Sequence, residues 1–263
     1  VYVWTVNNAE AINDMIENGA DMIITDDPVL ARETLMSYET TPLVVKMIKL
    51  FMKKNRLEMN MKEVKKVLTI AGSDSSGGAG IQADLKTMSA HNVFGMSVIT
   101  AVTAQNTKGV FGVYDVEPEF VGKQIDAVFD DIVPDAVKIG MVSNVEIIKV
   151  IIKYLENYKP KYIVLDPVMV STSGCMLLND DAMDILVNGL IPMATVITPN
   201  IPEAEVLSDV KIEDVNDMVT AAKKIFEKNN NTILIKGGHL ATCADDLLYD
   251  KDGVKWFRAE RID

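Results

Sequence analysis

The amino-acid sequence predicts an α/β fold, with a mostly parallel β-sheet and helices on both of its faces. Beyond residue 65, short runs of Val, Ile and Leu alternate with segments whose apolar residues repeat at the helical period. Continuous apolar runs are typical of strands buried on both faces, and their alternation with helices favours right-handed parallel crossovers. Because 48% of the 263 residues are hydrophobic, a large core can form, which excludes wholesale disorder.

Six apolar runs are the expected strands of this sheet. In chain order they are VLTIA, SVITAVTA, AVKIG, YIVLD, TVIT and TILIK. The segments with the clearest helical periodicity lie near residues 80–91, 118–130, 143–156, 180–189 and 214–228. The sequence contains no tandem repeats and no low-complexity tracts. The alternation therefore predicts a single domain over residues 65–263.

Residues 1–36 predict a separate strand-helix-strand-helix segment. VYVWTV and DMIITDDP have the composition of strands, Asn7 and Asn8 are typical helix caps, and Gly19 is a typical helix stop. Residues 37–64 differ, because they are amphipathic and locally basic. A solvated linker helix is the simpler interpretation of this stretch, and a helix that binds a membrane surface or a partner is the alternative.

Charge and cysteine content limit the classes of partner. With 38 acidic and 26 basic residues the formal charge is −12, so nucleic acid or an anionic membrane would need a local basic patch. Cys175 and Cys243 match no zinc or disulfide spacing, which favours a reducing compartment. There is no visible signal peptide and no apolar run of about 18 residues. We therefore expect a cytoplasmic location, no nucleic-acid partner and no stable membrane contact.

Polar residues follow the expected strands at the points where the strands end. In open parallel sheets, ligands bind outside the carboxyl ends of the strands, so these residues predict one shared site. They comprise a glycine-rich turn, an amide, two carboxylates and a lysine, with two neighbours: Gly72–Gly80, Gln105, Asp166, Glu203 and Lys236, with Met141 and Asn200. This set suits a polar organic substrate beside a metal-bound polyphosphate.

Each member of this set also has a simpler interpretation. The glycine-rich turn could be a tight strand-to-helix connection, since it lacks both the ribose-binding acid of a dinucleotide fold and the GK[ST] of a P-loop. Asp166 could cap a helix, although a carboxylate at the end of a buried strand is costly unless it is paired or metal-bound. Asn200 and Glu203 could form a helix-capping pair. Lys236 could be an ordinary surface lysine.

Asp84 and Gln105 give a different signal. Asp84 lies in the first turns of the helix after the glycine-rich turn, and Gln105 ends the neighbouring strand. An acid and an amide that face each other would suit a heteroaromatic ring with amino and ring-nitrogen groups, and a salt bridge or a cap is the alternative. His91 and His239 are too few and too far apart for a metal centre, and His91 is interpreted as structural.

One long stretch resembles a known family. TIAGSDSSGGAGIQADLKTMSAHNVFGMSVITAVTAQNT closely resembles the start of bacterial hydroxymethylpyrimidine/phosphomethylpyrimidine kinases, which belong to the ribokinase superfamily. KIGM, VLDPVM, SGCMLL, ITPNIPEAE and IKGGH continue the resemblance in order. It implies a ribokinase-like fold, with ATP and Mg²⁺ as cofactors. It also implies phosphorylation of 4-amino-5-hydroxymethyl-2-methylpyrimidine and then of its monophosphate, in thiamine diphosphate biosynthesis. Related kinases often form homodimers.

The resemblance also implies roles for individual residues. The residues that match the family's pyrimidine pocket are Gly72, Asp84, Gln105, Met141 and Val168. Asn200 and Glu203 match the N-x-x-E element for magnesium and phosphate. Asp166 matches the companion acid, so Asp166 and Glu203 are the expected metal-side carboxylates. Lys236 matches the lysine near the transferred phosphate.

One departure from the family concerns turnover. In the family a G-T-G-C segment follows the last matched strand, forms an anion hole at a helix N-terminus and carries the residue usually assigned as base. This sequence begins at Val1 and ends at Asp263, before such a segment. We therefore expect a fragment with little or no turnover, because loss of such donors commonly costs on the order of 10²–10³ in rate. Normal rates in an ATP-dependent assay would contradict this expectation.

The opening of the sequence resembles a second family. VYVWTVNNAEAINDMIENGADMIITDDPVLARETL is similar to the C-terminal end of a glycerophosphodiester phosphodiesterase, a TIM-barrel enzyme. This resemblance implies a partial barrel remnant that lacks the metal ligands and catalytic histidines of that family. Two other interpretations of the chain stay open. It could be a pyridoxal-type vitamin kinase of the same superfamily, or a non-catalytic or chimeric fragment.

Overall fold

The computed structural model describes residues 64–142, 144–169, 179–238 and 244–259, and the backbone of residues 2–3 and 22–23. The chain divides into two units, Val1–Glu63 and Val64–Asp263. In the first unit, β1 (Tyr2–Val3) pairs in parallel with β2 (Met22–Ile23). Both strands fall within runs that the sequence predicts as strands. The predicted helices of this unit, the linker at 37–64 apart from Val64, and both cysteines lie outside the described residues.

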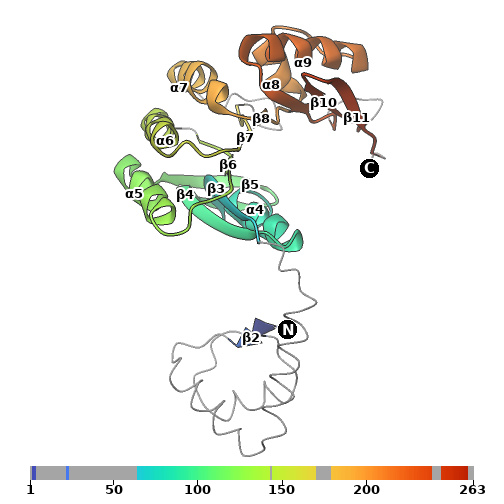
Figure 1. The fold of residues 1–263 in the computed structure, drawn as a ribbon. Helices are drawn as coiled ribbons and strands as arrows, with labels where there is room; N and C mark the ends of the chain where they lie inside the picture. Colours follow the sequence, from blue (N-terminus) through green and yellow to red (C-terminus); the bar gives the residue numbers. More distant parts are fainter. Residues whose placement is uncertain are drawn as a thin grey trace, which may run out of the picture. The chain divides into compact units, whose positions relative to one another are not determined.

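The described part of the second unit is built on a nine-stranded sheet (Figure 1), in the order β11-β10-β9-β8-β7-β6-β3-β4-β5. The six strands in its middle, from β9 to β4, run parallel to their neighbours. Each pairing that involves β5, β10 or β11 is antiparallel. The strands are β3 (Lys66–Asp74), β4 (Phe94–Asn106), β5 (Gly109–Asp115), β6 (Ala136–Ile139), β7 (Ile163–Leu165), β8 (Val196–Ile197), β9 (Thr232–Ile235), β10 (Asp246–Asp250) and β11 (Gly253–Phe257).

Helices cover both faces of this sheet, as the sequence predicts. In Figure 1, α4 lies on the side opposite α5, α6 and α7. The helices are α4 (Gly80–Ala90), α5 (Pro118–Phe129), α6 (Val145–Tyr158), α7 (Asp180–Ile185), α8 (Ile201–Ser208) and α9 (Val215–Asn229). The single helix expected near 180–189 is wrong in detail, because α7 is followed by a π-helical turn (Leu186–Leu190) and a 3-10 turn (Ile191–Met193).

Local sequence signals explain where several helices begin and end. Asn144 begins α6, because its side chain accepts hydrogen bonds from the backbone amides of Glu146 and Ile147. Asp214 and Asp217 form a reciprocal capping box at the start of α9. Lys159 ends α6 in the left-handed conformation, at φ 48°. These caps fix the lengths of the helices that pack on the sheet.

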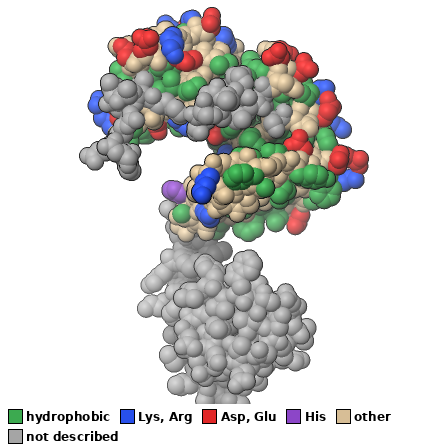
Figure 2. All heavy atoms as spheres, turned by 180° about the vertical axis from the view of Figure 1, so that it is seen from behind, with side chains coloured by type: hydrophobic (Ala, Val, Ile, Leu, Met, Phe, Trp, Pro, Cys, Tyr) green, Lys and Arg blue, Asp and Glu red, His purple; other side chains and the backbone are tan. Residues whose placement is uncertain are grey.

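The visible surface of the second unit carries charges of both signs. In Figure 2, Lys and Arg side chains are interspersed with Asp and Glu on the face shown, rather than gathered into one basic patch. None of the helices that the structure describes is both long and apolar enough to cross a membrane.

A close contact joins α5 to α6 in the core. The Tyr154 hydroxyl donates to Oδ2 of Asp126 at 3.0 Å, and the Tyr158 hydroxyl donates to Oδ1 at 2.6 Å. Phe129 stacks on Tyr158, with ring centroids 4.3 Å apart. A Cβ added at Gly122 would lie 2.7 Å from the Tyr154 ring. The absence of a side chain at Gly122 therefore lets α5 and α6 approach each other.

We predict that Gly122→Ala lowers the free energy of unfolding by about 1–3 kcal/mol, because Asp126 restrains the Tyr154 ring and the added methyl overpacks the contact. Urea denaturation measures the loss. Gly238→Ala is the matched control, since a Cβ there meets nothing within 4 Å, and it should change stability by less than about 0.5 kcal/mol. An equal loss from Gly122→Ala in a Tyr154→Leu background would contradict this explanation.

Candidate active site

Three predicted polar residues meet where β7, β8 and β9 end. The Lys236 ammonium donates to Oδ1 of Asp166 at 2.7 Å, and the Thr198 hydroxyl donates to the same oxygen at 3.2 Å. The Lys236 amide donates to the carbonyl of Pro199 at 2.9 Å, beside a backbone bridge between Asn200 and Lys236. The structure thus brings Asp166, Asn200 and Lys236 together at one edge of the sheet, as the strand order predicts.

Glu203 joins this group from the first turn of α8. Asn200 Oδ1 accepts from the Glu203 amide at 2.9 Å, and Glu203 Oε2 accepts from the Asn200 amide at 2.8 Å, so the capping-pair interpretation is confirmed. Glu203 Oε1 accepts from the Met169 amide at 3.3 Å. The residue is only 1% exposed. Burial raises the pKa of Glu203, and the negative charge of Asp166 acts in the same direction, whereas the Asn200 amide and Lys236 oppose it.

Gly72 and Met141 form an apolar wall at the ends of β3 and β6. A Cβ added at Gly72 would lie 3.5 Å from Met141 Cε and 3.7 Å from the carbonyl of Ala101. The Thr100 hydroxyl donates to the Met141 carbonyl at 3.4 Å. Val168 lies along the chain between Asp166 and Met169, and its amide donates to the Asp166 carbonyl at 2.9 Å. Met141 and Val168 therefore follow the neighbouring strands β6 and β7, and Gly72 lies near the end of β3, which pairs with β6.

The glycine-rich turn is organised by Asp74, which the sequence analysis did not single out. Its carboxylate accepts hydrogen bonds from the amides of Ser76, Gly78 and Ala79, at 2.8–3.0 Å. Burial opposes ionisation of Asp74, but the Ser76 amide and hydroxyl and the amides of Ala79 and Gly78 outweigh it and lower the pKa. A single ionised side chain therefore holds the turn in its shape.

Gln105 is held beside this turn by two hydroxyls. Ser75 Oγ donates to the Gln105 carbonyl at 2.8 Å and accepts from the Gln105 amide at 2.9 Å. Thr103 Oγ1 lies 3.2 Å from Oε1 of Gln105 and 3.0 Å from the carbonyl oxygen of Ser73. Sequence reasoning missed Ser75 and Thr103. The only signals were their positions: Ser75 lies in the glycine-rich turn, and Thr103 lies two residues before Gln105.

Asp84 has partners other than Gln105. Its Oδ2 accepts from the Thr69 hydroxyl at 2.6 Å and from the Lys138 ammonium at 2.8 Å. Asp84 therefore forms the salt bridge that was the alternative interpretation, beneath α4, and no hydrogen bond joins it to Gln105 among the described residues. Lys138 is a further residue that the sequence analysis missed, although a lysine inside the buried run AVKIG was a visible anomaly.

The donor set at the edge fits Mg²⁺ only in part. Asp166 Oδ1 is held by Lys236 and Thr198, while Oδ2 accepts no hydrogen bond within the described residues. Both oxygens of Glu203 accept from backbone amides, which leaves that carboxylate better suited to a contact through water. The described residues contain no group of three His, Cys, Asp or Glu side chains that could cage a metal. Mg²⁺ commonly binds one or two carboxylates together with substrate phosphates, so the residues fit an ion brought in with a polyphosphate.

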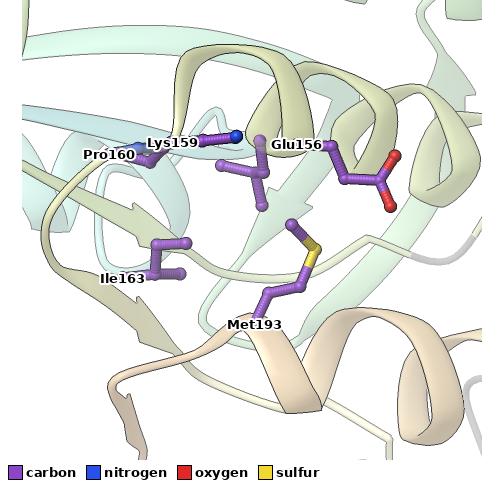
Figure 3. Close-up of a pocket in the computed structure, with 6 residues that line it drawn as sticks. Glu156, Lys159, Pro160, Ile163 and Met193 are labelled. Atoms are coloured by element: carbon purple, nitrogen blue, oxygen red, sulfur yellow. The ribbon is translucent and has the colours of Figure 1, made fainter.

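A separate cavity lies at the other end of β7, near the C-terminus of α6 (Figure 3). Its volume is about 360 Å³, and it is lined by Leu155, Glu156, Lys159, Pro160, Ile163 and Met193. Ile163 begins β7, whereas the predicted site residue Asp166 follows it. This cavity is therefore distinct from the candidate active site.

Comparison with known proteins finds matches to two families along the chain. Residues 74–263 match the phosphomethylpyrimidine kinase family, and residues 1–29 match the glycerophosphoryl diester phosphodiesterase family. The chain is 47% identical over 197 residues to a thiamine biosynthesis bifunctional protein, ThiED, of Geobacter sulfurreducens, and it spans 40% of the length of that relative. It is 50% identical over 198 residues to the hydroxymethylpyrimidine/phosphomethylpyrimidine kinase of Rhizobium meliloti, covering 74% of each chain.

Solved structures agree with the ribokinase-like fold. A phosphomethylpyrimidine kinase from Clostridium difficile is 55% identical, with a TM-score of 0.71, and the match covers 75% of this chain and 85% of that one. An ADP complex of a Bacillus subtilis pyridoxal kinase is 40% identical, also with a TM-score of 0.71, and covers 76% of this chain and 77% of that one. Both resemblances stated from the sequence are therefore confirmed.

We predict that Asp74→Asn removes a pH-dependent part of the stability. The folded pKa of Asp74 lies below its ordinary value of 3.8, so the ionised carboxylate stabilises the fold above about pH 4 and loses this effect as the pH falls through the folded pKa. Urea midpoints at pH 6 and pH 3 measure the change. The wild type should lose more stability than Asp74→Asn over this interval, and equal losses would contradict the assignment. Asp252→Asn, in the exposed turn between β10 and β11, is the control.

Proposed function

The chain belongs to the phosphomethylpyrimidine kinase family, and we propose that it transfers the γ-phosphoryl group of ATP to 4-amino-5-hydroxymethyl-2-methylpyrimidine. We propose a second transfer to the monophosphate of that product, on the route to thiamine diphosphate. The observation that carries the proposal is the Asp166–Lys236 pair at 2.7 Å, at the same edge of the sheet as Gly72, Met141 and Gln105. The proposed site therefore has two parts: a phosphate side with Asp166 and Lys236, and a ring side with Gly72, Met141 and Gln105.

The phosphate side has the charges that phosphoryl transfer requires. Lys236 is 41% exposed at its side chain, so its ammonium is accessible to a phosphate as well as to Asp166. Mg²⁺, when bound with ATP, would neutralise charge on the phosphate oxygens. Asp166 Oδ2 is the available direct ligand, and Glu203 would act through water. The Asn200 and Glu203 capping box holds these groups at the start of α8.

The ring side has few polar groups and one amide. Gly72 and Met141 supply the apolar contacts, with Val168 next to the phosphate side. Gln105 supplies hydrogen bonds to the ring, because its backbone is held by Ser75 and its side-chain amide can both donate and accept. Asp84 belongs to the same part of the site and lies on α4, where its carboxylate pairs with the Lys138 ammonium.

Organisation and assembly form a further part of the proposal. We propose a phosphodiesterase-like remnant over residues 1–36, a linker over 37–64 and a kinase domain over 65–263, in a cytoplasmic protein. The antiparallel edge strand β5 supports a homodimer, because all seven of its residues are exposed. Its large apolar side chains are Val110, Phe111, Val113 and Tyr114.

We predict that Lys236→Met lowers kcat/KM by about 10²–10³-fold, because it removes the positive charge that would stabilise the transferring phosphoryl group. Product formation from ATP and the hydroxymethylpyrimidine, followed by phosphorus NMR over long incubations, measures the effect even at low turnover. Lys211→Met is the matched control, since Lys211 pairs with Glu205 on the exposed surface. Product formation at the same rate in the wild type, Lys236→Met and Lys211→Met would contradict the proposed role of Lys236 in phosphoryl transfer.

A pyridoxal-type kinase is the second candidate, because the Bacillus subtilis pyridoxal kinase is 40% identical and has the same TM-score, 0.71, as the Clostridium difficile phosphomethylpyrimidine kinase. Parallel assays with pyridoxal and the hydroxymethylpyrimidine separate the two. We expect a higher kcat/KM for the pyrimidine. A higher value for pyridoxal would reverse the assignment while retaining the phosphotransferase class.

A further inference from the structure

Thr103 connects the substrate-facing amide to the backbone of the glycine-rich turn. It lies two residues before Gln105 in β4, so both side chains point to the same face of the strand. Its hydroxyl oxygen is within hydrogen-bonding distance of two oxygens, the Ser73 carbonyl at 3.0 Å and Gln105 Oε1 at 3.2 Å. Thr103 is only 6% exposed, so these protein groups, rather than bulk water, must satisfy the hydroxyl.

Counting hydrogens decides which group of Gln105 faces this hydroxyl. A threonine hydroxyl has one hydrogen to donate, and a backbone carbonyl can only accept. The hydrogen bond to Ser73 therefore consumes the hydrogen of Thr103. An amide oxygen at 3.2 Å would then meet the lone pairs of the hydroxyl, which is repulsive. Rotation of the amide by 180° exchanges oxygen and nitrogen without changing its shape, and it places Nε2 where it can donate to Thr103.

From this count we infer that Thr103 is a positioning residue for Gln105. It holds the amide with Nε2 towards its own hydroxyl, and it thereby sets which end of the amide accepts from the substrate ring and which end donates to it. The Ser75 hydroxyl fixes the backbone of Gln105 independently, with one donated and one accepted hydrogen bond. Thr103 is therefore the group that controls the remaining freedom, the rotation of the amide.

This orientation would select one form of the pyrimidine, and the inference rests on the proposed function for the identity of the ring. An amino group next to a ring nitrogen offers a donor beside an acceptor, which pairs with the oxygen and the remaining N–H of an amide in one orientation only. The 4-oxo ring offers an acceptor beside a protonated nitrogen, which requires the opposite orientation. An amide that cannot rotate therefore favours the amino ring, because the oxo ring would leave both hydrogen bonds mispaired.

Calorimetric binding to the wild-type chain and its variants tests the inference without requiring turnover. The two ligands are 4-amino-5-hydroxymethyl-2-methylpyrimidine and its 4-oxo counterpart. The wild type should bind the amino ring about 10²-fold more tightly, in line with two mispaired hydrogen bonds. Thr103→Val keeps the shape but removes the hydroxyl, so the ratio should fall below about 10-fold, chiefly because the oxo ring binds better. Thr103→Ser should keep the ratio within about threefold of the wild type.

Two comparisons separate positioning from a general structural role. Thr220→Val is the matched control, because the Thr220 hydroxyl donates to a backbone carbonyl at 3.0 Å within α9, away from the candidate site. It should leave the ratio unchanged. A merely structural role of Thr103 would weaken both ligands equally and leave their ratio intact. If Thr103→Val melts below the assay temperature, Thr103→Ala provides the same loss of hydroxyl.

Each outcome bears on the inference. A collapsed ratio in Thr103→Val, restored in Thr103→Ser, supports it. An unchanged ratio in Thr103→Val overturns the inference, and so does a wild type that binds both rings equally. In either case, phosphorylation of the amino ring by the wild type would leave the kinase proposal standing. A wild type that binds neither ring overturns the proposed substrate and the inference together.

Discussion

The candidate site depends on the parallel pairing of the central strands beyond their last ladder residues. The Gly140 amide donates to the carbonyl of Ile70, and the Asp166 amide donates to the carbonyl of Ile139. The Thr198 amide continues the series by donating to the carbonyl of Leu165. Because each strand end is hydrogen-bonded to its neighbour, the loops leave the sheet at fixed positions. The side chains that follow are thereby held at one edge before any ligand binds.

The edge places acids and a base close enough to constrain one another. Asp166 and Glu203 both lie near Lys236. Burial raises the pKa of Glu203, and the negative charge of Asp166 acts in the same direction. Lys236 offsets part of this repulsion, and the backbone amides of Asn200 and Met169 offset more. Asp166 and Lys236 form an ion pair with each other in this structure. An arriving cation would find the carboxylate of Asp166, and an arriving phosphate would find the ammonium of Lys236. The ion pair thus keeps the site balanced without a ligand.

The sequence predicted those site residues whose positions are fixed by the hydrogen-bonded pairing of the parallel strands. Asp166, Asn200 and Lys236 directly follow apolar runs, so strand order alone brings them together. Asp84 and Gln105 were expected to face each other, but their partners are Lys138, Ser75 and Thr103. Helix rotation and turn shape decide those contacts, and neither is visible in hydrophobic periodicity. The antiparallel strands β5, β10 and β11 also escaped prediction. β5 is exposed on every residue, so it lacks the alternation that marks a half-buried strand.

Hydroxyl residues within strands are the hardest to recognise from sequence. Thr103 stands in SVITAVTA, where a β-branched residue is already explained by its preference for strands. Its proposed second role, which is to orient the Gln105 amide, follows only from two nearby oxygens, the Ser73 carbonyl and the side-chain oxygen of Gln105. These oxygens decide where the hydroxyl hydrogen of Thr103 points. A carboxylate at the position of Gln105 would have two equivalent oxygens and would gain nothing from such a neighbour, whereas an amide must be oriented before it can discriminate. A glutamine that binds a ligand therefore requires a second residue to define its direction, and in this fold the strand repeat of two supplies it.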